Sequence, residues 1–505
     1  LNYQTTYFLT LLPLLLFLFF KKMTSDYINK IIKDFEVDSD LLKKLTRLYM
    51  KSMSGGLEHN VSTHDFLPMI PTFITALPSG LEQDKVLACD LGGTSFRCLY
   101  LSLKGNSKYE NEVKKWDIPS DYLGEEGANL PENALFDYLA KKILPFVKSL
   151  HEKENFIEYK LGFTFSYPVE QENLDKGKLI RWTKGFQIES VVGKDIIFLL
   201  QQSLNKYLER DYSEENFNIK VVALSNDTTG TLLSGSYTSK YGVQDVVDPI
   251  MSIICGTGFN VAYMEDLDNI KKLKPEIESE LKAKGATEMC INTESGSFDN
   301  NLELLPNTKY DAIVDKESTN PGYHLFEKRV SGMFLGEILR LVIVDLVEHN
   351  LLPKPTYTKL NTKFALKTEI LSHIEIDDSK DLKETELYLH QALDLQTTAA
   401  QRIEIQKITR AISRRSAYFV SIPIAAIIIK TGRLDPTSAK YKYHQELSIS
   451  CDGSVIQYYP GYKSMVRHGL AIGELGPDGE RKVHISIAWD GSGLGAGLAA
   501  ASTTL

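Results

Sequence analysis

The sequence is poor in cysteine and lacks several familiar metal and phosphate motifs. Its five cysteines (Cys89, Cys98, Cys255, Cys290 and Cys451) form no CxxC pair, and each lies in or beside an apolar run. We therefore expect buried, reduced thiols and a reducing, cytoplasmic location. The ten histidines include no HExxH motif. The GxxxxGK[ST] sequence is also absent, which disfavours a P-loop kinase.

The chain also lacks an excess of positive charge. Its 505 residues carry a net charge of −9, and the pI is about 5.7. An acidic protein has no broad positive field, so we expect neither a nucleic-acid partner nor binding to an anionic membrane. Any phosphate site must then be built locally, from loops and helix ends. The length exceeds what one hydrophobic core usually supports, which predicts two lobes.

One long apolar run occurs near the start, over residues 8–20, and Pro13 interrupts it. It is short for a membrane-spanning helix, which needs about 20 residues. It also lacks the preceding positive charge of a signal peptide, so we expect no stable membrane insertion. Met23 opens a helical pattern, and we expect residues 1–22 to be a dispensable apolar leader outside the fold. A membrane-anchoring leader is the alternative.

Two predicted β-hairpins share one layout of apolar strand, Gly/Thr turn and Phe-containing strand. The first pairs 86–91 with 96–103, and the second pairs 250–255 with 259–264. This similarity suggests an internal duplication in which each lobe contributes one phosphate loop.

Hydrophobic periodicity predicts further elements along the chain. Residues 23–81 read as helical, with breaks near Ser54-Gly55-Gly56 and at Pro68, Pro71 and Pro78. Strands are expected at 160–166 and 219–224, on either side of a loop-rich insertion. The predicted helices cover 131–152, 325–349, 384–394, 401–429 and 494–501.

Residues 223–236, with the sequence ALSNDTTGTLLSGS, are the most informative stretch. A buried strand is predicted to deliver Asn226 and Asp227 to the start of a helix. Open α/β sheets bind ligands at the carboxyl ends of their strands, and a helix N-terminus suits a phosphate. A general base beside a phosphate-binding loop is the minimum that phosphoryl transfer requires. The alternative is that Asp227 merely caps a structural helix.

Several further segments are individually ordinary and jointly specific. They are LACDLGGTSFR at 87–97, LGFTFSYP at 161–168, RWTKGF at 181–186, CGTGFN at 255–260, INTESGSFDN at 291–300, NPGYHLFEKRVSGMFLGEILR at 320–340, SCDGSVIQYYPG at 450–461 and DGSGLGAG at 490–497. In this order, the chain from Met23 to its end resembles the hexokinase family. The segment AISRRSAYFVSIPIAAIIIKTG at 411–432 is most similar to the fungal glucokinase branch.

The resemblance implies an α/β protein with the two-lobed, actin-like ATPase (ribonuclease H-like) sugar-kinase fold and a cleft between a small and a large domain. The implied division places an N-terminal helical segment at 23–84, packed on the large domain. The small domain would cover 85–225 and the large domain 226–505, with the C-terminal helix returning to the small domain.

The resemblance further implies ATP-dependent phosphorylation of glucose at its 6-hydroxyl to glucose 6-phosphate, the first step of glycolysis, by a monomer or homodimer. Alternatives are an amino-sugar or broad hexose kinase, for which the small Ser295 leaves room, and a non-catalytic sugar-sensing regulator. The presence of Asp227, Lys184 and Asp90 counts against the regulator.

Site residues also follow from the resemblance, position by position. Asp227 would be the catalytic base, and Lys184 would stabilise charge on the transferring phosphoryl group. The sugar would be bound by Ser166, Thr183, Lys184, Asn226, Asp227, Asn260, Glu294 and Glu327. ATP would be bound by Asp90, Gly92, Gly93, Thr94, Ser95, Arg97, Thr228, Thr257, Gly332, Asp452, Gly453 and Ser454, and Asp90 would orient Mg²⁺ through water.

The chain departs from the family pattern at four positions. Ser95 replaces the usual Asn, Ser295 replaces an aromatic residue, Val261 replaces a common Gly, and Trp489 is an uncommon neighbour of the final DGSG. None of these changes removes a catalytic group, so they bear on sugar preference and nucleotide affinity.

Overall fold

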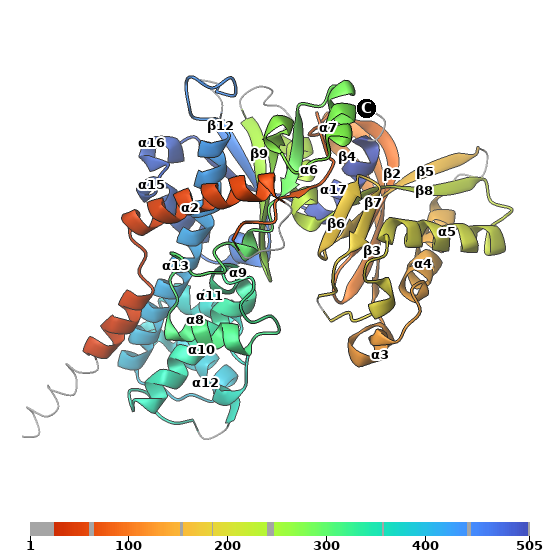
Figure 1. Ribbon diagram of the computed structural model, residues 1–505. Helices are drawn as coiled ribbons and strands as arrows, with labels where there is room; N and C mark the ends of the chain where they lie inside the picture. Colours follow the sequence, from red (N-terminus) through yellow and green to blue (C-terminus); the bar gives the residue numbers. More distant parts are fainter. Residues whose placement is uncertain are drawn as a thin grey trace, which may run out of the picture.

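The computed structural model describes residues 25–59, 65–151, 155–183, 185–239, 247–355, 358–441 and 446–502. These residues form two lobes, each built on a β-sheet (Figure 1). The five-stranded sheet of the small lobe has the order β4-β3-β2-β5-β8, and the six-stranded sheet of the large lobe has the order β1-β11-β10-β9-β12-β13.

The small-lobe sheet is covered by helices on both faces. Its strands are β2 (Gln83–Leu91), β3 (Ser95–Gly105), β4 (Lys108–Asp117), β5 (Ile157–Phe165) and β8 (Phe217–Ser225). Side chains of a strand alternate between faces. Leu87 and Cys89 accordingly join the core under α4 (Ala134–Leu150) and α5 (Ile196–Asp211), while Val86 and Ala88 join the core under α17 (Gly491–Ala501). A separate two-stranded sheet pairs β6 (Val169–Asn173) with β7 (Lys176–Leu179).

Both predicted hairpins are confirmed. In the small lobe β2 and β3 are antiparallel, and Leu91 pairs with Phe96 next to the turn. In the large lobe β9 (Val247–Cys255) and β10 (Phe259–Asp266) pair in the same way, with Cys255 opposite Phe259. The remaining large-lobe strands are β1 (Ile70–Pro71), β11 (Glu288–Asn292), β12 (Glu446–Asp452) and β13 (Val483–Ile487).

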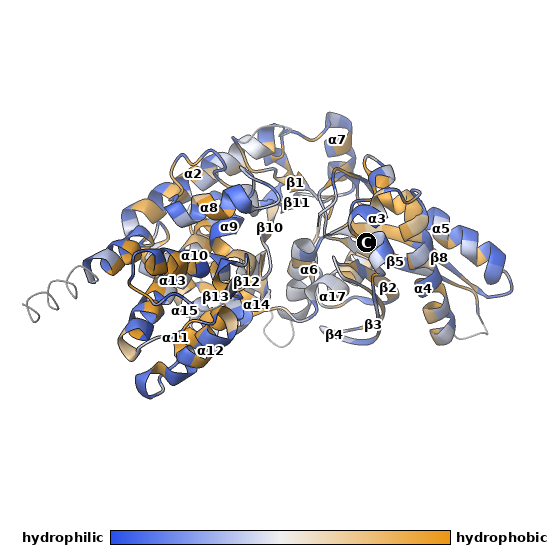
Figure 2. Ribbon diagram, turned by 90° about the horizontal axis from the view of Figure 1, so that it is seen from below, coloured by the Kyte–Doolittle hydropathy of each residue, from blue (hydrophilic) through white to orange (hydrophobic). Residues whose placement is uncertain are grey.

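The large lobe is mostly helical, and α13 (Ala399–Lys430) runs through its core. Figure 2 shows its largely hydrophobic colouring, and the helix is long and apolar enough to cross a membrane by length and composition. However, 89% of its most apolar stretch is buried inside the protein. It is therefore a core helix. The others are α2 (Ser39–Glu58), α7 (Pro275–Ala283), α8 (Lys309–Glu317), α9 (Glu327–Val330), α10 (Gly332–Glu348), α11 (Thr368–Ile376), α12 (Lys383–Leu393), α14 (Ser454–Tyr458), α15 (Tyr462–Ile472) and α16 (Gly476–Glu480), while the short α3 (Gly124–Ala128) belongs to the small lobe.

Two helices lie between the sheets and connect the lobes. Helix α6 (Asp227–Ser239) packs on the large-lobe sheet, α17 packs on the small-lobe sheet, and the two helices pack on each other. Their contact depends on glycine, because a Cβ at Gly495 would clash with the backbone of Gly230. The same helix approaches β5 closely, since a Cβ at Gly162 would clash with the carbonyl of Ala496.

Three expectations about local structure are wrong. Helix α2 continues through Ser54-Gly55-Gly56, because these glycines make room for Phe66 and the Leu67 carbonyl instead of ending the helix. The helix expected at 325–349 divides at Ser331, whose backbone is extended. The insertion before β8 contains the well-formed helix α5, which begins at the N-cap Asp195.

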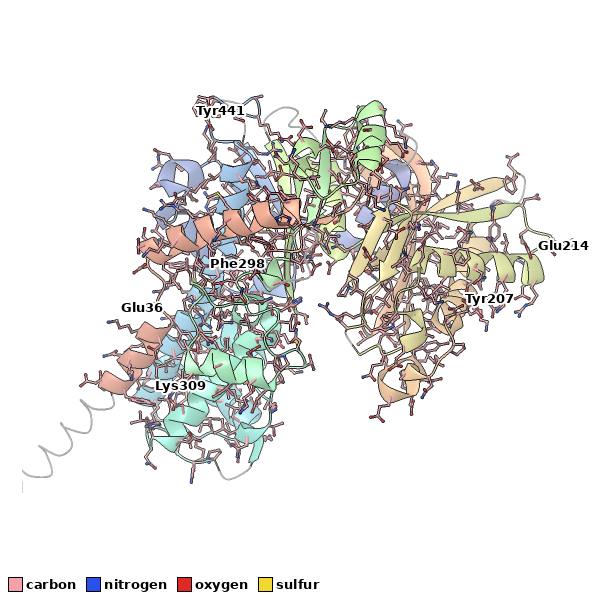
Figure 3. The ribbon with its side chains drawn as sticks, viewed as in Figure 1. Glu36, Tyr207, Glu214, Phe298, Lys309 and Tyr441 are labelled. Carbon is pink, nitrogen blue, oxygen red and sulfur yellow. The ribbon has the colours of Figure 1, made fainter. Side chains whose placement is uncertain are left out.

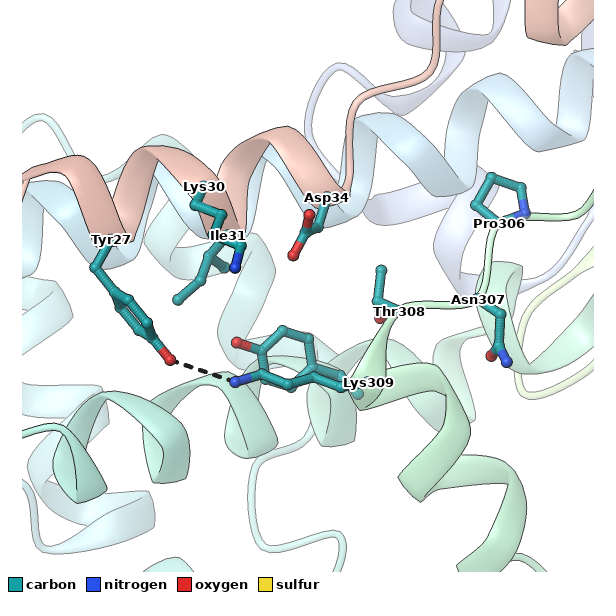
Figure 4. A pocket seen from close by; sticks show the side chains of 9 residues that line it. Tyr27, Lys30, Ile31, Asp34, Pro306, Asn307, Thr308 and Lys309 are labelled. Carbon is teal, nitrogen blue, oxygen red and sulfur yellow. Dashed lines mark hydrogen bonds between the residues drawn. The ribbon is translucent and has the colours of Figure 1, made fainter.

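A cavity of about 380 Å³ lies between the N-terminal helix at 25–34 and the segment that leads into α8 (Figure 4). Lys309 Nζ lies 3.3 Å from the Tyr27 hydroxyl on its wall. None of the candidate site residues lines this cavity, so it is separate from the site described next. The expected start at Met23 and the leader at 1–22 lie outside the described residues.

Candidate active site

Asn226 and Asp227 lie where β8 ends and α6 begins. The Asn226 side-chain oxygen accepts a hydrogen bond from the Thr229 N–H at 2.7 Å, which is the bond of an N-cap. One Asp227 oxygen, Oδ1, accepts from the Thr228 N–H (2.7 Å) and hydroxyl (3.1 Å). Its other oxygen has no hydrogen bond within the described ranges. Asn226 thus supplies the cap, and Asp227 keeps an oxygen available for chemistry.

Ser166 extends this group from the neighbouring strand. It follows β5, and its hydroxyl accepts from the Asp227 N–H at 3.2 Å. Thr183 also lies in the small lobe, directly before Lys184, which lies outside the described residues. The small lobe and the start of α6 thus present Ser166, Thr183, Asn226 and Asp227.

A second polar group forms in the large lobe around Glu294. Asn260 Nδ2 donates to Asn292 Oδ1 at 2.7 Å, and Asn292 Nδ2 donates to Glu294 Oε1 at 2.8 Å. Glu294 itself has a left-handed backbone (φ 54°, ψ 47°), a strained conformation for a residue with a side chain. Asn292 was missed in the sequence, although it lies two residues before Glu294 in the motif.

Glu327 joins this group through two close-packed glycines. Its Oε2 accepts from the Phe259 N–H at 2.8 Å, and its Oε1 lies 3.6 Å from His324 Nδ1. A Cβ at Gly258 would lie 2.9 Å from this carboxylate, and one at Gly296 would lie 3.2 Å from the Glu327 Cβ. The loops that carry Asn260, Glu294 and Glu327 therefore meet.

The turn between β2 and β3 is held by backbone contacts. Gly92 N–H donates to the Ser95 carbonyl at 2.9 Å, and the Tyr167 hydroxyl donates to the Gly92 carbonyl at 3.0 Å. Thr94 is exposed and Gly93 is partly exposed. This geometry leaves turn atoms accessible to an anion.

Arg97 connects this turn to the start of α17. Its Nη2 donates to Asp90 (2.6 Å) and to the Ser492 hydroxyl (2.8 Å), and its Nη1 donates to Asp490 (2.9 Å). Burial opposes the charge of this guanidinium, but the neighbouring Asp90 and Asp490 carboxylates raise its pKa overall. Asp490 and Ser492 were missed as site residues, although the DGSG motif at a helix start was the signal.

Three glycines from separate segments build the facing wall in the large lobe. Gly332 N–H donates to the Gly256 carbonyl at 2.7 Å, and Gly453, with φ 112°, would bring a Cβ within 2.5 Å of the Cys255 backbone. Only glycine allows this approach. Thr257 and Ser454 are exposed beside these glycines.

Asp452 links this wall to Asp227. Burial, followed by the charges of Asp227 and Asp490, raises the pKa of Asp452. The three carboxylates therefore lie close enough for their charges to interact, and Thr228 forms part of the buried start of α6.

A magnesium site can be tested against these residues. The described ranges contain no group of three or more His, Cys, Asp or Glu side chains that could hold a metal ion. Asp90 offers one partly exposed carboxylate whose Oδ2 is held by Arg97 and Ser492. Mg²⁺ keeps several waters and uses few protein ligands, so a single carboxylate fits this ion.

The two groups of polar side chains are not joined to each other. Ser166, Asn226 and Asp227 form one, with Thr183 elsewhere in the small lobe, and Asn260, Glu294 and Glu327 form the other. In the part of the chain that the structure describes, no hydrogen bond or ion pair connects them. A ligand that contacts both groups would bridge the lobes.

Comparison with known proteins identifies the family. Two hexokinase family models match residues 27–237 and 250–502. The chain is 48% identical to Glucokinase-1 of Saccharomyces cerevisiae, over 94% of this chain and 96% of that protein. It is 47% identical to Glucokinase-1 of Kluyveromyces lactis, over 94% and 97%. The structure resembles a hexokinase from Schistosoma mansoni complexed with glucose (TM-score 0.77, 29% identity, 95% of this chain and 99% of that chain). This chain belongs to the hexokinase family.

Proposed function

We propose that this protein transfers a phosphoryl group from ATP to the 6-hydroxyl of glucose and forms glucose 6-phosphate. The observation that carries the proposal is Asp227, whose carboxylate keeps one oxygen available while Asn226 caps the helix. The similarity to glucokinases over nearly the whole chain supports the same activity.

Asp227 is the proposed general base. It accepts the proton of the 6-hydroxyl as the oxygen attacks the γ-phosphorus, and Ser166 holds its backbone in place. Glu294 and Glu327 accept hydrogen bonds from ring hydroxyls. A buried hydroxyl without a partner costs about 1–3 kcal/mol, so these carboxylates discriminate between sugars.

The nucleotide lies between the β2–β3 turn and the glycine wall in this proposal. The exposed turn at Gly93 and Thr94 approaches the phosphates, and Arg97 contributes a permanent positive charge beside them. Mg²⁺ bound through water to Asp90 would neutralise phosphate charge. Lys184 has the same role on the transferring group, as an expectation from the sequence.

The amino-sugar alternative receives no support from Ser295. Its hydroxyl lies 2.5 Å from those of Tyr49 and Thr293, and the residue is fully buried. The space that its small side chain leaves is therefore used by Tyr49. The free, buried state of all five cysteines supports our proposal of a cytoplasmic location. The assembly as a monomer or homodimer stays a prediction.

A coupled assay with ATP tests the proposed activity. We expect kcat/KM for glucose to exceed that for fructose by about 100-fold, because Glu294 and Glu327 are placed for one arrangement of ring hydroxyls. Mannose and N-acetylglucosamine serve as comparison sugars. Similar values for glucose and fructose would leave a hexose kinase standing and remove its glucose preference.

Glucose should also change the tryptophan emission through Trp182. Its indole N–H donates to the Ile188 carbonyl at 2.7 Å, its ring stacks on Phe186, and it directly precedes Thr183. Sugar bound at Thr183 should disturb this packing. We expect titration with glucose to quench or shift the emission of the wild type, and Trp182→Phe to lose this signal. Trp489→Phe is the control, and an unchanged signal in Trp182→Phe would place the responding group elsewhere.

A further inference from the structure

A buried chain of three hydroxyls lies behind Glu294. The Tyr49 hydroxyl on α2 is 2.5 Å from Ser295 Oγ, which is 2.5 Å from Thr293 Oγ1. Thr293 Oγ1 in turn donates to the Val261 carbonyl at 2.8 Å. All three hydroxyl-bearing residues are fully buried.

The number of available protons fixes the direction of the hydrogen bonds among these three hydroxyls. A carbonyl oxygen only accepts, so the single hydroxyl proton of Thr293 goes to Val261. Thr293 can then only accept from Ser295, and Ser295 must accept from Tyr49. Burial raises the pKa of Tyr49 to about 12, which keeps its phenol a neutral donor.

The chain of hydroxyls holds both sequence neighbours of Glu294 in place. Thr293 and Ser295 flank this residue, and their backbone N–H groups donate to the Val261 carbonyl at 3.0 Å and to Asn260 Oδ1 at 3.2 Å. A left-handed backbone at a residue other than glycine persists only where its surroundings over-determine it. The hydroxyl chain and these two bonds supply that constraint.

The Tyr49 ring reaches the second acidic loop as well. It packs on Phe298 with centroids 4.9 Å apart, and Phe298 packs on Phe326, the residue before Glu327. Figure 3 shows Phe298 in the large lobe, just below α2. One side chain of α2 therefore supports the loops of both Glu294 and Glu327 from behind.

We infer that Tyr49 is a positioning residue for sugar binding, which fixes the left-handed backbone and hence the carboxylate of Glu294 through its hydrogen bond to Ser295. The inference rests on the proposed function. It gives helix α2, which belongs to neither sheet, a role in sugar selectivity. Tyr49 has this role without contacting the sugar itself.

Tyr49→Phe tests this role, because it keeps the ring packing and removes only the hydroxyl. We expect the glucose KM to rise about tenfold, the effect of one modest hydrogen bond, with kcat within about twofold. Tyr310→Phe is the matched control. Tyr310 is an equally buried tyrosine in the same lobe whose hydroxyl donates to Asp345 at 2.7 Å, so its loss should leave the glucose KM unchanged.

Monodeoxy glucoses separate positioning from general destabilisation. Each monodeoxy glucose lacks one ring hydroxyl, and its KM is compared with that of glucose. The hydroxyl that Glu294 binds is the one whose removal raises KM in the wild type but not in Glu294→Gln. In Tyr49→Phe the KM penalty for that same deoxy sugar should shrink, while the penalties for the other deoxy sugars persist. A uniform change for all sugars, or no change, would overturn the inference.

Isothermal titration of glucose in the absence of ATP provides a second readout that needs no turnover. Weaker binding of glucose to Tyr49→Phe than to Tyr310→Phe supports the inference, and equal binding contradicts it. Absence of glucose binding and phosphorylation in the wild type would instead overturn the proposed function, together with the role of Tyr49.

Discussion

Asp227→Asn should lower kcat about 10²- to 10⁴-fold, or roughly 3–5 kcal/mol of barrier. The amide keeps the size of the carboxylate and can still accept from Thr228, but it takes no proton at neutral pH. Glucose binding should change much less, because the remaining sugar residues are intact. The measurements are kcat, the glucose Kd and the Tm on this one variant.

The geometry makes the competing outcome distinct. If Asp227 only stabilised α6, the variant would have a lower Tm and normal turnover. The capping hydrogen bond, however, is accepted by Asn226. Asp195→Asn is the matched control, since Asp195 caps α5 in the small lobe by accepting from Ile197 and Phe198. This control should turn over normally. Turnover of Asp227→Asn within a factor of about three of the wild type would exclude the base, because losing a base costs far more.

Gly495→Ala should destabilise the protein by about 3 kcal/mol or more, at the upper end for overpacked sites. Its Cβ would meet the backbone of Gly230, which cannot rotate away as a side chain does. Since α17 and α6 connect the two sheets, the added methyl group should push the helices apart. Thermal and urea unfolding should both report the loss, with activity falling as α6 shifts Asp227.

Gly497→Ala provides a control on the same helix. A Cβ there would meet Cδ1 of Leu101, the far end of a flexible side chain that can adopt another rotamer. We expect its destabilisation to be clearly smaller. Equal losses of stability at both positions would show that the effect of Gly495→Ala does not come from the contact with Gly230.

The sequence predicted best those features that depend on neighbouring residues. The two hairpins are marked by Gly-rich turns between apolar strands, and the β8–α6 junction by Asn226 and Asp227 after an apolar run. The sequence also contains the signal that predicts helix α5. Asp195 followed by apolar residues at helical spacing is an ordinary helix start, and the segment was wrongly interpreted as loop-rich.

Features that depend on distant pairing could not be predicted. Gly55 and Gly56 suggest a helix end locally, and only the arrival of Phe66 and Leu67 explains why the helix continues. The hydroxyl contact between Tyr49 and Ser295 joins residues 246 positions apart. Periodicity places Tyr49 on a buried face without indicating what lies opposite.

The position of α17 has a consequence for the order in which the protein can be assembled. The strands of the small-lobe sheet are synthesised early, but one face of that sheet is covered by Gly491–Ala501, near the end of the chain. Val86 and Ala88 on that face stay without this helix until α17 has been synthesised. Domains usually complete their fold as units from the N-terminus onward. Here the sheet of the small lobe waits for a helix that follows the whole large-lobe sheet in the chain, and until then its apolar face is exposed to aggregation.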